Sequence, residues 1–181
     1  MATNPYFKQG VRSEQTVYED IIIEALKMYG QDVYYLPREI VNKDNVFLDD
    51  VPSRFGNAYK VEMYIENTEA FDGEGDLFTK FGIELRDQAN FIVSRRRWKS
   101  LVGNRLAENN FRPREGDLIY IPFLAQSGEM YEIKYVNFSE AFYVLGNKYP
   151  YFYKLELEKF KYSQEVISTG SIGLDTALGI G

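Results

Sequence analysis

The chain opens with a helical repeat of apolar side chains. Between positions 13 and 29 these side chains recur every three or four residues, and polar residues gather on the opposite side. This periodicity predicts an amphipathic helix over 13–29. Ser13 is placed to cap its first turn, and Gly30 can take the left-handed conformation that ends a helix. The apolar positions are Val17, Tyr18, Ile21, Ile22, Ala25, Met28 and Tyr29.

After this helix the pattern changes to the two-residue alternation of β-strands. Polar and apolar side chains alternate over 59–66, and shorter runs at 32–36, 77–85 and 91–93 also have strand character. We therefore expect strands in these four segments. The polar and acidic stretch 42–52 is expected to be an exposed loop.

Four strand-like runs follow one another in the second half of the chain. They lie at 117–123, 130–138, 142–145 and 151–160, and turn residues separate them. This order predicts a four-stranded antiparallel meander over 116–160. Short, evenly spaced strands favour a small barrel or sandwich. The expected fold is mainly β (α+β): an antiparallel β-barrel or sandwich with one N-terminal amphipathic helix and a short second helix.

Length and composition favour one domain. The chain has 181 residues, of which 45% are hydrophobic, enough to bury a single core. Aromatic residues reach 16%, which is typical of half-buried strands and of protein interfaces. We expect a single domain over 1–168, followed by a glycine-rich tail or linker at 169–181. No apolar stretch approaches the roughly 18 residues of a transmembrane helix.

The composition also removes much common catalytic chemistry. The chain contains neither His nor Cys, which excludes Ser-His-Asp and Cys-His catalysis and leaves only oxygen ligands for a metal. Its formal net charge of -6 gives no positive field for tight DNA binding. We therefore assign no catalytic, cofactor-binding or metal-binding residue and no cofactor. Because carboxylates are plentiful, a carboxylate-based hydrolase is kept as an alternative.

An acidic loop is expected between 67 and 76. The alternating carboxylates at 72, 74 and 76 resemble the opening of a calcium loop. However, Leu77 occupies the place of the sharp-turn glycine, and Ile83 the place of the bidentate glutamate. A solvated loop is therefore favoured over a calcium site. Its acidic residues are Glu69, Asp72, Glu74 and Asp76.

One concentrated positive cluster lies at the start of the expected second helix, which Ser94 can cap and Gly103 can end. It can contact DNA phosphate or an acidic neighbouring subunit, since Arg and Trp are common interface anchors. The alternative is a solvated helix start whose arginines form ion pairs within the chain. The cluster consists of Arg95, Arg96, Arg97 and Trp98.

Several strings of this sequence resemble one known family. They are MATNPYF at 1–7 with VRSEQ at 11–15, MYGQDVYYLPRE at 28–39, and RPREGD at 112–117. In these residues the chain is similar to the neck proteins of T-even-type contractile-tailed phages. The resemblance extends to about residue 168, and members of such a family are expected to continue beyond residue 181.

The resemblance implies a structural, non-enzymatic protein of the virion neck that completes the DNA-filled head and joins it to the tail. It implies a six-fold ring with DNA passing through its lumen, without sequence-specific binding. Other partners would be a head-side adaptor, a tail terminator and a collar or whisker fibre protein. In that ring the arginine cluster would lie at an interface and the acidic loop at the channel. A tail terminator, a collar component and a carboxylate-based virion hydrolase remain the alternatives.

Overall fold

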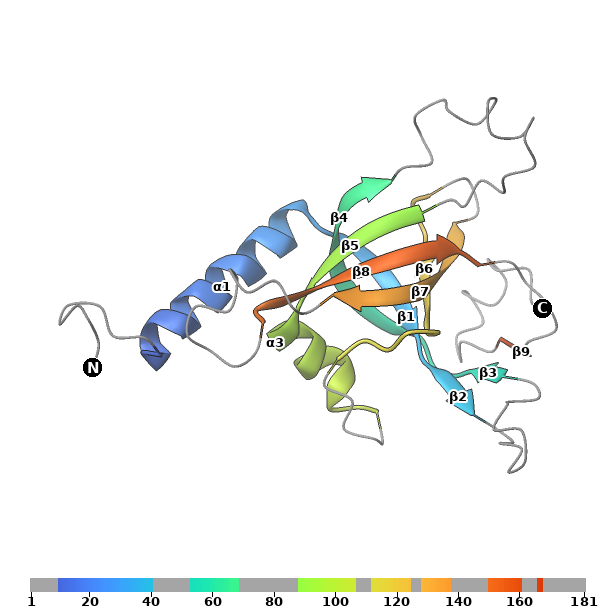
Figure 1. The fold of residues 1–181 in the computed structure, drawn as a ribbon, viewed down its shortest axis with the longest axis horizontal. Helices are drawn as coiled ribbons and strands as arrows, with labels where there is room; N and C mark the ends of the chain where they lie inside the picture. The colour runs from blue at the N-terminus through green and yellow to red at the C-terminus, as the bar shows by residue number, and fades with distance from the viewer. Residues whose placement is uncertain are drawn as a thin grey trace.

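The computed structural model describes residues 10–40, 53–68, 88–106, 112–124, 128–137, 150–160 and 166–167. Within these ranges, six antiparallel strands close into a barrel in the order β1-β4-β5-β8-β7-β6, with β6 returning to β1 (Figure 1). The barrel strands are β1 (Gln31–Leu36), β4 (Tyr59–Thr68), β5 (Gln88–Ser94), β6 (Leu118–Ile121), β7 (Glu129–Asn137) and β8 (Phe152–Lys159). This confirms the mainly β fold class with an antiparallel barrel.

Alternation along the strands decides which side chains fill the barrel. In β4, Val61 and Met63 are fully buried, whereas Lys60 and Glu66 are exposed. Successive side chains of a strand point to opposite faces, so the two-residue pattern read from the sequence places one set inside. In β8, Leu155 is likewise buried while its neighbours point outward. The predicted strand at 59–66 and its inward face are confirmed.

Two irregularities bend the sheet so that it can close. The register shifts between Ile65 and Asn67 where β4 pairs with β5, and between Ile133 and Tyr135 where β7 pairs with β8. Such bulges increase local twist and bend the strand that carries them. They lie on either side of the β5–β8 pair in the barrel order and help a sheet of only six strands to curl onto itself.

The predicted meander is confirmed for three of its four strands, and the expected position of the fourth, between β7 and β8, is wrong. β6, β7 and β8 are antiparallel neighbours, but β7 pairs directly with β8. A strand at 142–145 between them is therefore excluded by this register, and residues 142–145 themselves lie outside the described ranges. The other neighbour of β8 is β5, a long-range pairing that the local pattern did not indicate. The expected loop at 42–52 and the expected strand at 77–85 also lie wholly outside these ranges.

A second, smaller sheet lies at one end of the barrel. It contains β2 (Arg38–Ile40), β3 (Ser53–Phe55) and β9 (Val166–Ile167) in the order β2-β3-β9. β3 is antiparallel to β2 and parallel to β9. Because β2 follows β1 after a single residue, this sheet continues directly from the barrel wall.

Two helical segments lie beside the barrel (Figure 1): α1 (Arg12–Tyr29), and α3 (Arg95–Trp98), which runs directly into the π-helical turn η2 (Lys99–Gly103). The predicted helix at 13–29 and the short second helix are thus confirmed. Of the helices in the described ranges, none has the length and apolar character needed to cross a membrane.

The predicted helix caps are wrong in detail. α1 begins one residue earlier than expected, so Ser13 lies inside the first turn and Val11 occupies the N-cap without a side-chain hydrogen bond. Ser94 occupies the N-cap of α3 but makes no capping side-chain hydrogen bond. Gly30 has an extended φ of -78° instead of a left-handed one. Glycine is needed here because it is small. A Cβ at this position would clash with the backbone oxygen of Leu26 and would lie 2.9 Å from the backbone oxygen of Met63.

Candidate interaction surfaces

Three successive arginines fasten the second helix to the rest of the molecule. Arg95 lies 3.3 Å from Glu19 of α1, and Arg96 lies 2.6 Å from Asp20 on the same helix. Arg97 points the other way, because successive residues of a helix differ in direction by about 100°. Side chains that are adjacent in sequence therefore connect α3 to two separate elements.

The contact of Arg97 is with Glu62 of β4 and is bidentate. Its Nε donates to one carboxylate oxygen at 3.2 Å and its Nη2 to the other at 2.6 Å. These hydrogen bonds lower the pKa of Glu62 below its ordinary 4.5 and raise the pKa of Arg97. Two parallel hydrogen bonds of this kind between a guanidinium and a carboxylate are stronger and more specific than a single contact.

The structure therefore supports the intramolecular alternative for the arginines, although their predicted contact with a neighbouring molecule stays a prediction. Trp98 is different. Its side chain is 0% exposed and meets Tyr35 edge-on, with the ring centroids 4.5 Å apart. The indole is thus part of the barrel core and has no surface to offer, which corrects its expected role as an interface anchor.

A buried carboxylate joins the start of β6 to the end of β1. Asp117, only 1% exposed, accepts hydrogen bonds from the Tyr35 hydroxyl and from the backbone N–H of Arg38 at 2.7 Å. Arg114 Nε approaches the same carboxylate at 3.3 Å, and its Nη2 donates to the Arg38 carbonyl at 3.1 Å. These hydrogen bonds join the side chains of Tyr35, Arg114 and Asp117 and the backbone of Arg38 into one polar cluster where β1, β2 and β6 meet, which we call the polar knot.

Burial governs the protonation of this knot. Loss of solvation raises the pKa of Asp117 above its ordinary 3.8, against the opposing effect of its hydrogen-bond donors. Burial, reinforced by the adjacent carboxylate, also raises the pKa of Tyr35 well above its ordinary value. Because its donors come from the protein itself, Asp117 has the surroundings of a structural carboxylate. In the described ranges, no three potential metal-ligating side chains cluster together.

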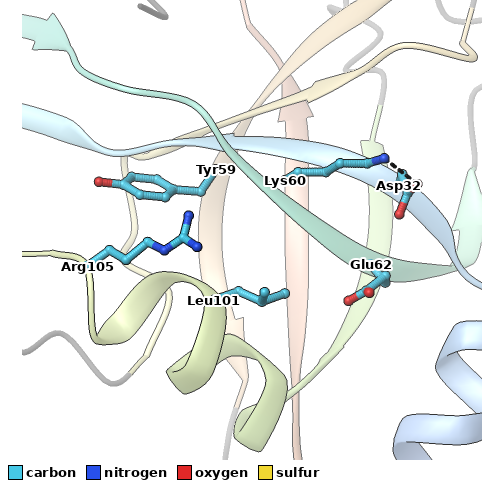
Figure 2. A pocket seen from close by; sticks show the side chains of 6 residues that line it. All are labelled: Asp32, Tyr59, Lys60, Glu62, Leu101 and Arg105. Atoms are coloured by element: carbon cyan, nitrogen blue, oxygen red, sulfur yellow. Dashed lines mark ion pairs between the residues drawn. The ribbon is translucent and has the colours of Figure 1, made fainter.

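A polar hollow of about 410 Å³ lies between β1, β4 and η2 (Figure 2). On one side, Lys60 makes a 2.8 Å ion pair with Asp32, and this contact raises the lysine pKa. On the other, Figure 2 shows the Arg105 guanidinium beside the ring of Tyr59. The hollow is lined by two basic and two acidic side chains, a balance of charge that suits solvation better than an anion or cation site. Its remaining lining residues are Glu62 and Leu101.

A larger apolar groove of about 480 Å³ runs between α1 and the outer surface of the barrel. The strand side consists of Tyr64 from β4, Ile92 from β5 and Phe152 from β8. Tyr64 and Ile92 are direct partners in the register of their strands, so they form one continuous apolar patch on the solvent side of the sheet. The helix side of the groove consists of Tyr18, Ile22, Ala25, Leu26 and Tyr29.

Neither this groove nor the Asp117 knot was anticipated from the sequence as a feature of its own. For the groove a signal existed in the unusually wide arc of apolar positions on α1. For the polar knot the sequence contained no such signal, because Tyr35 and Asp117 are 82 positions apart. The expected channel residues Glu69, Asp72, Glu74 and Asp76 lie outside the described ranges, so their role and the calcium alternative stay predictions.

Comparison with known proteins adds a finding that the geometry does not contain. A family model described as virus neck protein matches residues 1–179 of the chain. No solved structure matches it. The match extends over almost the whole sequence, including the helix, the barrel strands and the second sheet.

Proposed function

The chain belongs to the family of virus neck proteins of T4-like phages, and from this membership we propose that it forms a closed ring around the DNA channel between head and tail. Its role in the phage neck is structural, and its place is in the virion at the head–tail junction. The proposal goes further: six copies complete the DNA-filled head and provide the surface to which the tail attaches.

The observation that carries the ring is the filled interior of the barrel. Trp98, Phe91 and Leu155 belong to one cluster of buried core residues, and each is 0% exposed. Barrels of eight strands are just wide enough for side chains, so one of six strands has no room for a DNA duplex. If DNA passes this protein, the channel has to be enclosed by several copies and not by one chain.

The net negative charge of the chain supports a channel through which DNA passes rather than a surface that binds DNA tightly. The sequence has 27 acidic against 21 basic residues, so it offers no overall positive field to hold a phosphate backbone. Cations near the barrel are moreover engaged by carboxylates, as in the Arg97–Glu62 and Lys154–Glu66 pairs. A ring of such subunits would let DNA slide through its lumen without sequence-specific contacts.

We further propose that the chain catalyses no reaction and needs no cofactor. Support comes from the missing His and Cys and from the internal hydrogen bonding of Asp117, the most buried carboxylate described. Its proposed partners are other copies of itself, a head-side adaptor, a tail terminator and a collar or whisker fibre protein. Membership of the family supports contact with other virion components in general.

The deciding experiment is a cryo-electron microscopy reconstruction of the neck from particles that carry this chain. We expect a six-fold ring of barrels between head and tail, with DNA density on its axis. Particles made without the chain should accumulate as separate filled heads and tails, and purified chain added later should join them. A chain located away from the junction, or joined particles formed without it, would contradict the proposal.

A further inference from the structure

Helix α1 has a wider apolar face than the barrel covers. Its apolar residues occupy an arc of about 180° from Val17 round to Leu26, on a helix with 3.6 residues per turn, and Ile23 lies beyond that arc. The half-buried side runs from Tyr18 round to Ile23, and its middle is rotated by about 80° from the middle of the apolar arc. One edge of the apolar arc therefore points away from the barrel.

The uncovered edge forms a ridge made of Val17, Ile21 and Met28. These side chains are 60%, 55% and 75% exposed. They lie within about 40° of one another on the helix, so they form a single line along it. Contiguous apolar surface of this kind marks an interaction site far more often than do single exposed apolar residues.

The ridge borders the apolar groove described above. Ala25 and Tyr29 belong to the groove and lie next to Ile21 and Met28 on the helix. On its far side the groove is bounded by the outer sheet surface at Tyr64, which is 38% exposed. The same chain therefore presents a convex apolar ridge and a concave apolar groove side by side.

We propose that the ridge of α1 in one copy packs into the groove of a second copy of this chain. The inference rests on the proposed ring, for which it supplies the contact between neighbouring subunits. Ridge and groove are different surfaces, so each copy gives its ridge to one neighbour and its groove to the other. Such a heterologous contact can repeat and close into a ring, whereas a two-fold contact stops at a dimer.

The available area suits a contact that is repeated around a ring. The ridge rises about 16 Å from Val17 to Met28, and a helix seated over that length with half of its circumference covered buries about 300–400 Å² on each partner. The total of about 600–800 Å² is below the range of specific interfaces between two isolated proteins. Each contact would be weak alone, and ring closure would add the second contact that each subunit needs.

The test uses the full chain with one charge placed on each surface. Ile21→Glu alters the ridge and Tyr64→Glu alters the groove, while Tyr135→Glu is the matched control, a 48% exposed residue on β7. Native mass spectrometry and light scattering would follow association over a concentration series. We expect wild type and the control to associate alike and the other two to associate at least about tenfold more weakly, with circular dichroism unchanged.

Mixing the two altered chains makes the test directional. The Tyr64→Glu copy keeps an intact ridge and the Ile21→Glu copy an intact groove, so the mixture should form one-to-one heterodimers and nothing larger. Absence of that heterodimer, a monomeric wild type at about 1 mM, or wild-type association by both variants would overturn the inference. Variants that self-associate normally but fail to bind another virion protein would also overturn it, because the occupant would then be that protein.

The outcomes separate this inference from the proposed function. Rings that still form from Ile21→Glu and Tyr64→Glu would leave the neck ring standing and refute only the ridge-and-groove contact. A directional heterodimer from a protein that the reconstruction places away from the DNA axis would keep the contact and refute the ring around DNA.

Discussion

The hydroxyl of Tyr35 donates a hydrogen bond to the carboxylate of Asp117 at the buried end of the barrel. Tyr35 lies in strand β1 and points into the core, and Asp117 immediately precedes strand β6. Since β1 and β6 are the two strands whose pairing closes the barrel, this contact lies at the closure itself. Tyr35 also touches Trp98, so the polar knot is continuous with the apolar core.

Replacing Asp117 with Ala should be strongly destabilising. It would leave the Tyr35 hydroxyl and the Arg38 N–H without their acceptor, and we expect a loss of about 3–5 kcal/mol in the free energy of unfolding. Tyr35→Phe removes one donor but leaves the carboxylate its other partners, so about 1.5–3 kcal/mol is expected. Urea unfolding monitored by circular dichroism measures both values. Equal stability of Asp117→Ala and wild type would show that the knot is not structural.

The same carboxylate should give stability a distinctive pH dependence. Its pKa is raised above 3.8 in the folded chain, so the folded state holds this proton more tightly than the unfolded state does. The contribution that this proton on Asp117 makes to the free energy of unfolding is therefore fully present below pH 3.8, and it is lost as the pH rises through the raised pKa. Asp117→Asn should lack this decline. The check is the difference between variant and wild-type unfolding curves across a pH series, where a constant difference would contradict the prediction.

The Arg97–Glu62 pair should give stability the opposite pH dependence, with a loss toward acid pH. The pKa of Glu62 is lowered from 4.5, so its contribution to stability is present above pH 4.5 and is lost as the pH falls through the lowered pKa. Both side chains are partly exposed, and the pair should contribute about 0.5–1 kcal/mol. Arg97→Gln is expected to remove this acid-sensitive part of the stability. Lys134→Gln, which breaks an exposed pair with Glu132, is the control and should change stability less.

Trp98 offers a test of the packed interior. It is the only tryptophan of the chain and is fully buried, so its fluorescence should be blue-shifted when folded and move to the red on unfolding. Trp98→Ala should cost about 3–5 kcal/mol because it leaves a large cavity. Trp98→Phe keeps a ring against Tyr35 and should cost clearly less. A stable, cooperative Trp98→Ala variant would mean that the barrel does not depend on this side chain.

Gly30 should not tolerate a side chain. An alanine Cβ would collide with the Leu26 oxygen and crowd the backbone of Met63, although the φ angle itself suits any residue. We expect Gly30→Ala to cost about 2 kcal/mol and to loosen the junction of α1 with the barrel. Gly116→Asn is a useful contrast, since its φ of +89° is left-handed but the nearest atom lies 3.6 Å away. Hydrogen exchange of the α1 amides would show whether the loosening is local.

The local parts of the fold were legible in the sequence. The span of α1 and the inward face of β4 follow from periodicities of 3.6 and 2, which short-range sterics impose on every helix and strand. The left-handed φ of +76° at Gly128 likewise fits its expected place in a turn. These features depend on neighbours within a few residues, and the sequence reports such neighbours directly.

Features that depend on distant partners were not legible. Pairing of β5 with β8 joins segments separated by some sixty positions, and nothing in either segment specifies the other. The contact between Glu19 of α1 and Arg95 of α3 likewise joins residues 76 positions apart, and neither segment specifies the other. For the arginine cluster, ion pairs within the chain were one of the two alternatives, and the structure shows such pairs, whereas contact with a neighbouring molecule stays a prediction.

Closure of the barrel has a consequence for the time before assembly. A closed sheet leaves no row of unpaired backbone groups, and such rows are what allow strands of different chains to zip together indiscriminately. Among the strands that the structure describes, free edges remain only in the short sheet of β2, β3 and β9. Newly made copies crowded in an infected cell would thus be kept from edge-to-edge aggregation and would meet only through their side chains, where recognition is selective.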